Sequence, residues 1–195
     1  GLYNSRAFFE ALVREVERAR RYRHPLTLAY LDLDDFKRIN DTMGHPAGDE
    51  VLRTVARILR SFLRSSDVVA RLGGDEFAIL LVETRRTAAE RVLRKLHARI
   101  SADLAASVAG TTVSVGAAIV ETLVPPADEL IRRADALMYE VKRSGKNGCL
   151  VRDPQAGTRG VPGTESSGGK LARGLRYAAG TGTIGADLVT FSASV

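Results

Sequence analysis

The stretch RLGGDEFAILL, which runs from Arg71 to Leu81, places two glycines and two acids inside an otherwise hydrophobic pattern. Gly73 and Gly74 can adopt positive φ angles at low cost, and aspartate favours turns, so the residues could simply reverse the chain between two strands. The same turn could instead present the carboxylates of Asp75 and Glu76 to a metal ion. The surrounding sequence has to distinguish these two interpretations.

A second group of acids follows a hydrophobic run in the stretch LTLAYLDLDDFKRIND. Asp32 lies at the carboxyl end of that run, where open α/β sheets commonly bind ligands. A carboxylate buried there would be costly without a cation or hydrogen-bond donors. We therefore interpret Asp32 as a metal ligand, and Asp35 as the N-cap of a short helix that follows.

The two acidic stretches can belong to one site. If the strand over 68–72 lies beside the strand over 27–33, the turn acids arrive near Asp32. Two or three carboxylates form a hard oxygen site, which favours Mg²⁺ or Mn²⁺ over Zn²⁺ and points to phosphoryl chemistry. The histidines are widely separated and form no competing cluster. Composition and spacing alone still leave a plain acidic turn open.

Three lysines could supply positive charge for phosphates. Lys37 follows Asp32 by five residues, and Lys142 and Lys146 lie four residues apart in YEVKRSGKNG. Lysines at the end of a helix also interact favourably with the helix dipole, so they indicate a site only if the acidic site is real.

Hydrophobic periodicity predicts the elements that position these residues. We expect helices over 5–22, 35–41, 47–64, 89–100 and 130–141, and strands over 26–34, 68–72, 76–82, 111–120 and 148–151. Interleaved helices and strands predict a layered α/β sandwich, and the hairpin over 68–82 predicts antiparallel pairs within a mixed sheet.

Composition predicts one folded unit followed by a tail. The 195 residues are 45% hydrophobic, which suits a single core, but residues 152–195 hold nine of the 18 glycines. We therefore predict a folded domain over 1–151 and a flexible, glycine-rich tail over 152–195. The chain has no apolar run near the ~20 residues of a membrane span and no signal pattern, so we expect no membrane segment in it.

Charge and cysteine content set further limits. The single cysteine, Cys149, excludes an internal disulfide and suits a reducing compartment. The net charge of +6 suits anionic partners, but the arginines are scattered, and no basic cluster interleaved with aromatics is present. A nucleic-acid-binding module is therefore not expected.

Several motifs in this order resemble the GGDEF domain, the catalytic domain of bacterial diguanylate cyclases. RLGGDEF contains the motif that names the family, and DLDDFKRINDTMGHPAGD is similar to the family pattern DxDxFKxxNDxxGHxxGD at every fixed position. NSRAFFEAL resembles the first helix, TVSVGAA a later strand, and ADALMYEVKRSGKNG the last helix. The resemblance covers residues 1 to about 151. It implies a palm-like α/β sandwich with a mixed, mostly antiparallel five-stranded sheet.

The resemblance implies an active site with two Mg²⁺ or Mn²⁺ ions. Asp32 and Asp75 would bind the metals with help from the Leu33 carbonyl. Glu76 would lie beside the metals and help to activate an attacking 3′-hydroxyl.

It also implies how the substrate is held. Asn40 and Asp49 would read the guanine edge, where aspartate can accept from N1–H and the exocyclic amine while asparagine can donate. Lys37, Lys142 and Lys146 would contact the phosphates. The family commonly has arginine in the last of these positions, and lysine keeps the charge but loses the bidentate fork.

The implied reaction condenses two GTP molecules into cyclic di-GMP and two pyrophosphates. One domain would hold one GTP, so a homodimer would be needed. The alternative is an inactive GGDEF domain that binds GTP or cyclic di-GMP as a receptor. Such domains typically lose the acids of the motif, which this sequence retains.

Arg64 and Asp67 have the RxxD spacing that this family uses as an inhibitory site for its product. Five residues separate Asp67 from Gly73, which favours this interpretation over a simple helix end followed by a loop aspartate.

The sequence departs from the family pattern in two places. Ser5 stands where the family usually has arginine, and the chain starts without the Asp-x-Leu-Thr turn that commonly precedes the first helix. A missing turn could loosen the adjacent edge of the site. We further expect a cytoplasmic domain whose upstream sensor domain is missing from this chain, and the full-length protein could be membrane-anchored.

Overall fold

The computed structural model describes residues 2–107 and 111–153. Within them the helices are α1 (Ser5–Tyr22), α2 (Phe36–Met43), α3 (His45–Phe62), α4 (Arg86–Ser107) and α5 (Ala127–Arg143). The strands are β1 (Leu26–Asp34), β2 (Val68–Gly73), β3 (Glu76–Val82), β4 (Thr112–Val120) and β5 (Cys149–Arg152). Each predicted element is present, with ends that differ mostly by a few residues. The largest difference is in α4, which extends further at its carboxyl end.

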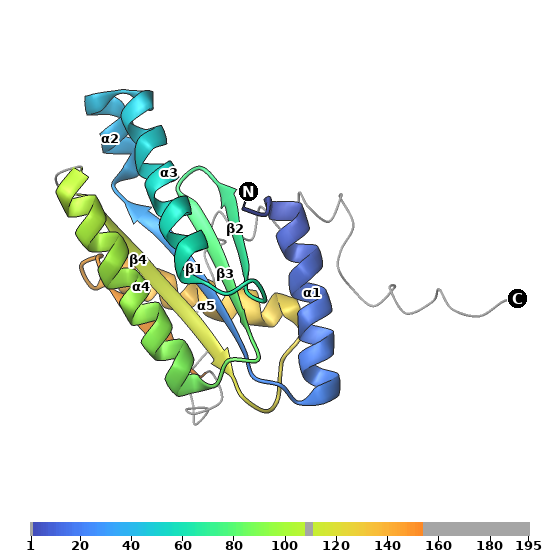
Figure 1. The fold of residues 1–195 in the computed structure, drawn as a ribbon. Helices are drawn as coiled ribbons and strands as arrows, with labels where there is room; N and C mark the ends of the chain where they lie inside the picture. Colours follow the sequence, from blue (N-terminus) through green and yellow to red (C-terminus); the bar gives the residue numbers. More distant parts are fainter. Residues whose placement is uncertain (1, 108–110, 154–195) are drawn as a thin grey trace, which may run out of the picture.

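The strands form one mixed sheet in the order β2-β3-β1-β4-β5. The pairs β2–β3, β3–β1 and β1–β4 are antiparallel, and β4–β5 is parallel. The predicted fold class, a mostly antiparallel five-stranded sheet flanked by helices, is therefore confirmed. Figure 1 shows the hairpin of β2 and β3 at one side of the sheet and α4 running along β4.

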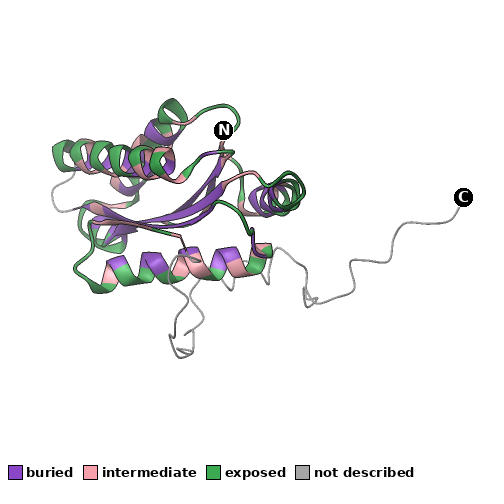
Figure 2. Cartoon of the chain, turned by 90° about the horizontal axis from the view of Figure 1, so that it is seen from below, coloured by how far each residue is buried: buried purple, intermediate pink, exposed green. Residues whose placement is uncertain are grey.

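Strand β1 is buried along its whole length because helices cover both faces of the sheet. One hydrophobic core lies between the sheet and α2, α3 and α4. The other lies between the sheet and α1 and α5. Figure 2 shows the buried strands between these two helical layers. The continuous apolar run over 26–31 follows from this double coverage.

Local sequence sets the helix ends and the closeness of packing. The Asn4 side chain accepts a hydrogen bond from the Ala7 amide at 2.9 Å and caps α1. In β4, a Cβ atom on Gly116 would lie 2.0 Å from the Met138 amide nitrogen. Only glycine at this position lets α5 pack so closely on the sheet.

Two expectations concern the ends of the fold and its relation to membranes. The tail predicted over 152–195 lies outside the described residues, apart from Arg152, which ends β5, and Asp153. In the part of the chain that the structure describes, no helix is both long and apolar enough to cross a bilayer.

Candidate functional site

The sheet register brings the two acidic stretches together. Asp32 of β1 pairs directly with Glu76 of β3, and the Leu33 amide donates a hydrogen bond to the Asp75 carbonyl oxygen at 3.2 Å. Directly paired residues on antiparallel strands point to the same face, so the side chains of Asp32 and Glu76 share the face covered by α5. The predicted meeting of the acids is therefore present.

The route to this meeting differs from the prediction. The sequence argument supposed the strand over 68–72 beside β1, but β3 occupies that position and β2 is an edge strand that pairs with β3. Sequence order did not reveal this because either arm of a hairpin can join a sheet. Because β3 pairs with β1 and begins at Glu76, Glu76 lies next to Asp32.

The glycine turn is open and is held by an arginine. A Cβ atom on Gly73 or Gly74 would meet nothing within 4 Å, and Gly74 has a φ of +50°. The Arg71 guanidinium donates two hydrogen bonds to the Gly74 carbonyl, at 3.0 and 2.8 Å. The sequence analysis assigned no role to Arg71. Its position just before the glycines could have indicated this role, because an arginine guanidinium can donate two hydrogen bonds to one nearby carbonyl oxygen.

The segment before α1 supports the same hairpin. The Tyr3 amide donates to the Val69 carbonyl at 2.9 Å, and the Arg71 amide donates to the Tyr3 carbonyl at 3.1 Å. These bonds cover part of the outer edge of β2. The edge that a missing turn could loosen is therefore held by Tyr3 in the described chain.

Asp32 is buried and carries an ion pair. Its carboxylate lies 2.7 Å from the Lys142 ammonium of α5. Burial raises the pKa of Asp32 above its ordinary value, Lys142 opposes that rise, and the negative charge of Asp75 adds to it. Lys142, which we predicted to bind phosphate, thus pairs with Asp32, which we predicted to bind metal.

Asp35 corrects one expectation. It occupies the N-cap position of α2 with a φ of +55°, but its side chain makes no capping hydrogen bond. Its carboxylate instead pairs with the Lys146 ammonium at 2.7 Å, and this hydrogen bond lowers the pKa of Asp35 and raises that of Lys146. The left-handed backbone at Asp35 aims the carboxylate toward the loop after α5 rather than at the helix amides.

Asn40 and the backbone beside Asp49 lie against each other. A Cβ atom on Gly48 would come within 2.0 Å of the Asn40 Oδ1 atom, so glycine allows α2 and α3 to approach here. Asp49 is the next residue on α3 and is exposed, and Lys37 is exposed near the start of α2. The predicted guanine pair and one predicted phosphate contact are thus on the two helices that follow β1.

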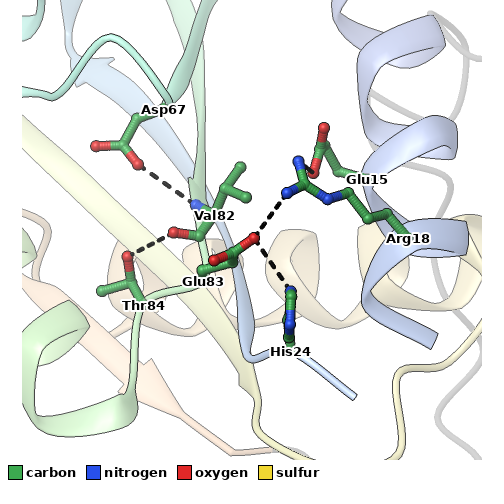
Figure 3. A network of polar contacts seen from close by, with 7 residues as sticks. All are labelled: Glu15, Arg18, His24, Asp67, Val82, Glu83 and Thr84. Carbon is green, nitrogen blue, oxygen red and sulfur yellow. Dashed lines mark hydrogen bonds and ion pairs between the residues drawn. The ribbon is translucent and has the colours of Figure 1, made fainter. Parts of the chain in front are cut away.

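The RxxD pair forms a tight connection between α3 and β2. The Asp67 carboxylate accepts from the Arg64 amide at 3.0 Å and from the Val82 amide at 3.3 Å, while the Arg64 side chain is exposed. Figure 3 shows Asp67 directed toward Val82, next to the contacts of Glu83 with Arg18 and His24. Asp67 therefore has a structural partner at the end of β3.

The carboxylates fit a hard cation by chemistry but are not gathered into a preformed cluster. In the described ranges, no three His, Cys, Asp or Glu side chains lie close enough together to hold a metal ion. The charges of Asp75 and Asp34 nevertheless raise the pKa of Asp32, which indicates mutual repulsion that a cation would relieve. The carboxylate oxygens of Asp32 and Asp75 are donors that suit Mg²⁺ or Mn²⁺, and in this structure the Lys142 ammonium pairs with Asp32.

Together the sheet and the site define a palm-like α/β domain with an acidic hairpin next to its central strand. The family model described as "Diguanylate cyclase, GGDEF domain" matches residues 1–148. The chain belongs to the GGDEF domain family.

Curated relatives and solved structures agree with this assignment. The chain is 35% identical over 158 residues to the probable diguanylate cyclase DgcT of Escherichia coli. This alignment covers 78% of this chain and 34% of that protein. It is 38% identical to the cyclic di-GMP phosphodiesterase NbdA of Pseudomonas aeruginosa, over 75% of this chain and 19% of that protein. The GGDEF domain of DgcB from Caulobacter crescentus, solved in complex with cyclic di-GMP, aligns with a TM-score of 0.71 at 31% identity, covering 77% of this chain and 91% of that one.

The chain spans only a fifth to a third of the length of these two curated relatives. Their names also differ in activity, since one is a probable cyclase and the other a phosphodiesterase. Family membership therefore establishes the domain, while its activity has to be argued from the site.

Proposed function

We propose that this domain is a diguanylate cyclase that condenses two GTP molecules into cyclic di-GMP and two pyrophosphates. The observation that carries the proposal is the pairing of Asp32 with Glu76, with Asp75 in the adjoining glycine turn. An inactive relative has no need to keep all these acids next to an open turn. The intact RLGGDEF sequence within a family-matched domain supports the same conclusion.

Diguanylate cyclases of this family generally use a divalent metal ion. We propose that the Asp32 and Asp75 carboxylates and the Leu33 carbonyl hold two Mg²⁺ or Mn²⁺ ions. The bound metal would lower the pKa of a hydroxyl group and stabilise negative charge on a phosphoryl group.

The remaining residues bind and orient the substrate. Asn40 and Asp49 would recognise the guanine edge, and Lys37, Lys142 and Lys146 would bind the phosphates. Both lysines of the last helix and its loop already hold carboxylate oxygens at 2.7 Å, so each can exchange one anionic oxygen for another. Lys142 would leave Asp32 when the substrate arrives.

Each condensation forms one phosphodiester bond. The 3′-oxygen of one GTP attacks the α-phosphorus of the other, the bond to the bridging oxygen breaks, and pyrophosphate leaves. Glu76, on the face that also carries Asp32, would accept the hydroxyl proton. The second condensation closes the ring, so two domains must face each other with one GTP each.

The direct test is product formation. Purified protein with GTP and Mg²⁺ is expected to yield cyclic di-GMP and pyrophosphate, measured by chromatography. Asp75→Ala should remove at least about 99% of the rate, since losing a group that stabilises transition-state charge commonly costs 10²–10³-fold.

Two controls make this test decisive. Asp75 is half-buried beside the exposed glycines of the turn, so Asp75→Ala should unfold at nearly the wild-type temperature. Asp103→Asn, which removes a carboxylate paired with Arg99 on α4, should keep full activity. Wild-type protein that binds GTP but makes no product, even when artificially dimerised, would overturn the cyclase proposal.

We also propose that Arg64 and Asp67 bind cyclic di-GMP as an inhibitory product site. The exposed Arg64 guanidinium is available for a phosphate, while Asp67 holds the turn that presents it. Arg64→Ala should raise the cyclic di-GMP concentration for half inhibition at least about tenfold without changing the initial rate, because a charged hydrogen bond is worth roughly 1.5–3 kcal/mol. An unchanged inhibition curve would show that this segment is only a helix end.

A second function remains a candidate because specific observations favour it. The domain could bind GTP or cyclic di-GMP without turnover, as a receptor. The Lys142–Asp32 ion pair and the absence of a three-acid cluster among the described residues favour this alternative, and a relative named as a phosphodiesterase matches the same domain. Binding without product formation in the experiment above would establish it.

A further inference from the structure

The loop between α5 and β5 carries Lys146 in an unusual backbone conformation. Gly145, Lys146 and Asn147 have φ angles of +116°, +65° and +46°. Residues with side chains rarely adopt left-handed backbone conformations. Two such residues in succession, here Lys146 and Asn147, keep this conformation only where the surrounding structure holds them. The groups that hold this loop therefore decide where the Lys146 ammonium lies.

Asp34 ties the loop to the sheet, beside the Val115 amide of β4, which donates to the Gly148 carbonyl at 2.8 Å. Asp34 is 3% exposed, and its Oδ2 atom accepts a hydrogen bond from the Asn147 amide at 3.1 Å. The same carboxylate accepts from Thr112 at 2.6 Å and from Ser114 at 2.8 Å, and both donors lie on β4. A buried carboxylate with three donors is rigidly oriented, so the Asn147 amide has a fixed anchor.

Asn147 links the loop to α4 as well. Its Oδ1 atom accepts from the Ser101 hydroxyl at 3.3 Å, so the residue after Lys146 is held from two elements. Lys146 itself is exposed and contacts Asp35, the neighbour of Asp34. Two consecutive aspartates thus hold two consecutive loop residues.

We propose that Asp34 is a positioning residue that sets the place of Lys146 through the Asn147 amide, and so supports phosphate binding. This role rests on the proposed function, in which Lys146 contacts the phosphates of GTP. Asp34 itself is turned into the protein, between β1, β4 and the loop, and acts through its hydrogen bonds. It differs in this respect from Asp32, which lies two residues earlier on the same face of β1.

A double-mutant cycle tests the proposal. Asp34→Ala and Lys146→Met are each expected to weaken GTP binding about tenfold, since losing one charge-assisted hydrogen bond to a phosphate commonly costs about that factor. If Asp34 acts through Lys146, the double variant should bind GTP no more than about twofold more weakly than Lys146→Met alone. Guanosine, which has no phosphates, should bind the single variants as tightly as wild type. Additive losses, or equal losses for guanosine, would overturn the proposal.

Conservative variants keep the test falsifiable. Asp34→Asn retains one acceptor oxygen and should recover most of the lost GTP affinity. If Asp34→Ala does not fold, Asp34→Leu takes its place in the cycle, because leucine fills the same buried space but accepts no hydrogen bond from the Asn147 amide. Failure of Asp34→Leu to weaken GTP binding, or additivity with Lys146→Met, would overturn the proposal equally.

Hydrogen exchange separates this proposal from the proposed function. The Asn147 amide should exchange at least about tenfold faster in Asp34→Ala than in wild type, with or without nucleotide. Wild-type protein that does not bind GTP would overturn the function. Unchanged exchange of the Asn147 amide would overturn the positioning role, whatever the protein binds.

Discussion

At the scale of single residues, the site holds a buried negative charge at Asp32 that the fold has to neutralise. Asp32 is buried, and Lys142 compensates for it only in part, because burial remains the largest influence on its pKa. Buried charges that serve binding commonly reduce stability in the unbound state. We therefore expect the Asp32 carboxylate to lower the stability of the unbound fold while it serves the site.

Asp32→Asn should stabilise the ligand-free protein at pH 7. The pKa of Asp32 is raised in the folded state, so the folded protein binds more protons than the unfolded chain from the ordinary value of 3.8 up to the raised value. The free energy of unfolding therefore falls as pH rises through that window. Above the raised pKa, the ionised Asp32 carboxylate lowers the stability of the fold. A gain of about 1 kcal/mol would raise the melting temperature by roughly 2–4 °C.

The measurement is thermal unfolding of both proteins from pH 3 to pH 8. The difference should vanish below the ordinary pKa of aspartate, where Asp32 is protonated in both states. Asp103→Asn is the control, because it removes a carboxylate paired with Arg99 on the surface of α4 and should change little. An Asp32→Asn variant that melts below wild type at pH 7 would contradict the argument.

At the scale of elements, two glycines have opposite roles. Gly116 permits contact between β4 and α5, where the Met138 backbone occupies the position that a Cβ would need. Gly73 lies in the hairpin next to open space. One glycine thus fixes the helix that carries Lys142, and the other leaves room at the site.

Gly116→Ala should destabilise the fold by at least about 2 kcal/mol, since overpacking against backbone forces elements apart. Gly73→Ala is the matched control and should stay within about 0.5 kcal/mol of wild type. Denaturant unfolding of the three proteins measures both effects. Equal stability of the two variants would mean that α5 can move away from β4 at little cost.

At the scale of the whole molecule, the acidic hairpin includes the edge strand β2, and its glycine turn is open. An open site suits a reaction in which a second subunit brings the other substrate. The proposed chemistry needs two such sites facing each other, because each domain would hold one GTP. Protein concentration should therefore control the rate.

At concentrations below the dimer dissociation constant, the initial rate of cyclic di-GMP formation should rise with the square of protein concentration. An excess of Asp75→Ala protein should suppress wild-type activity, because mixed dimers contain one defective site. A control excess of Asp103→Asn, which keeps its site, should increase the rate. A rate proportional to concentration over the whole range, unaffected by the Asp75→Ala protein, would contradict the two-domain reaction.

The fold follows closely from hydrophobic periodicity. The strand over 26–34 and the helix over 5–22 have the predicted bounds, because their apolar spacing is long and regular. The helix bounds near Gly44 and the end of α4 were less accurate, since ends depend on local hydrogen bonds. The motifs also pointed to Asp32, Asp75 and Glu76, which the sheet brings together, while their role in catalysis stays a prediction.

Only the tertiary structure decided how those residues are paired. The sequence determined that Asp32 lies near the carboxyl end of a buried strand and that Asp75 and Glu76 adjoin the glycine turn of a hairpin. The sheet decided that β3 rather than β2 lies beside β1, so that Glu76 is opposite Asp32. It also decided that Lys142 binds Asp32, that Lys146 binds Asp35, and that Asp34 holds the loop over 145–148. The physical reason is that periodicity and turns are local, whereas pairing across 44 to 113 positions depends on how packed elements meet.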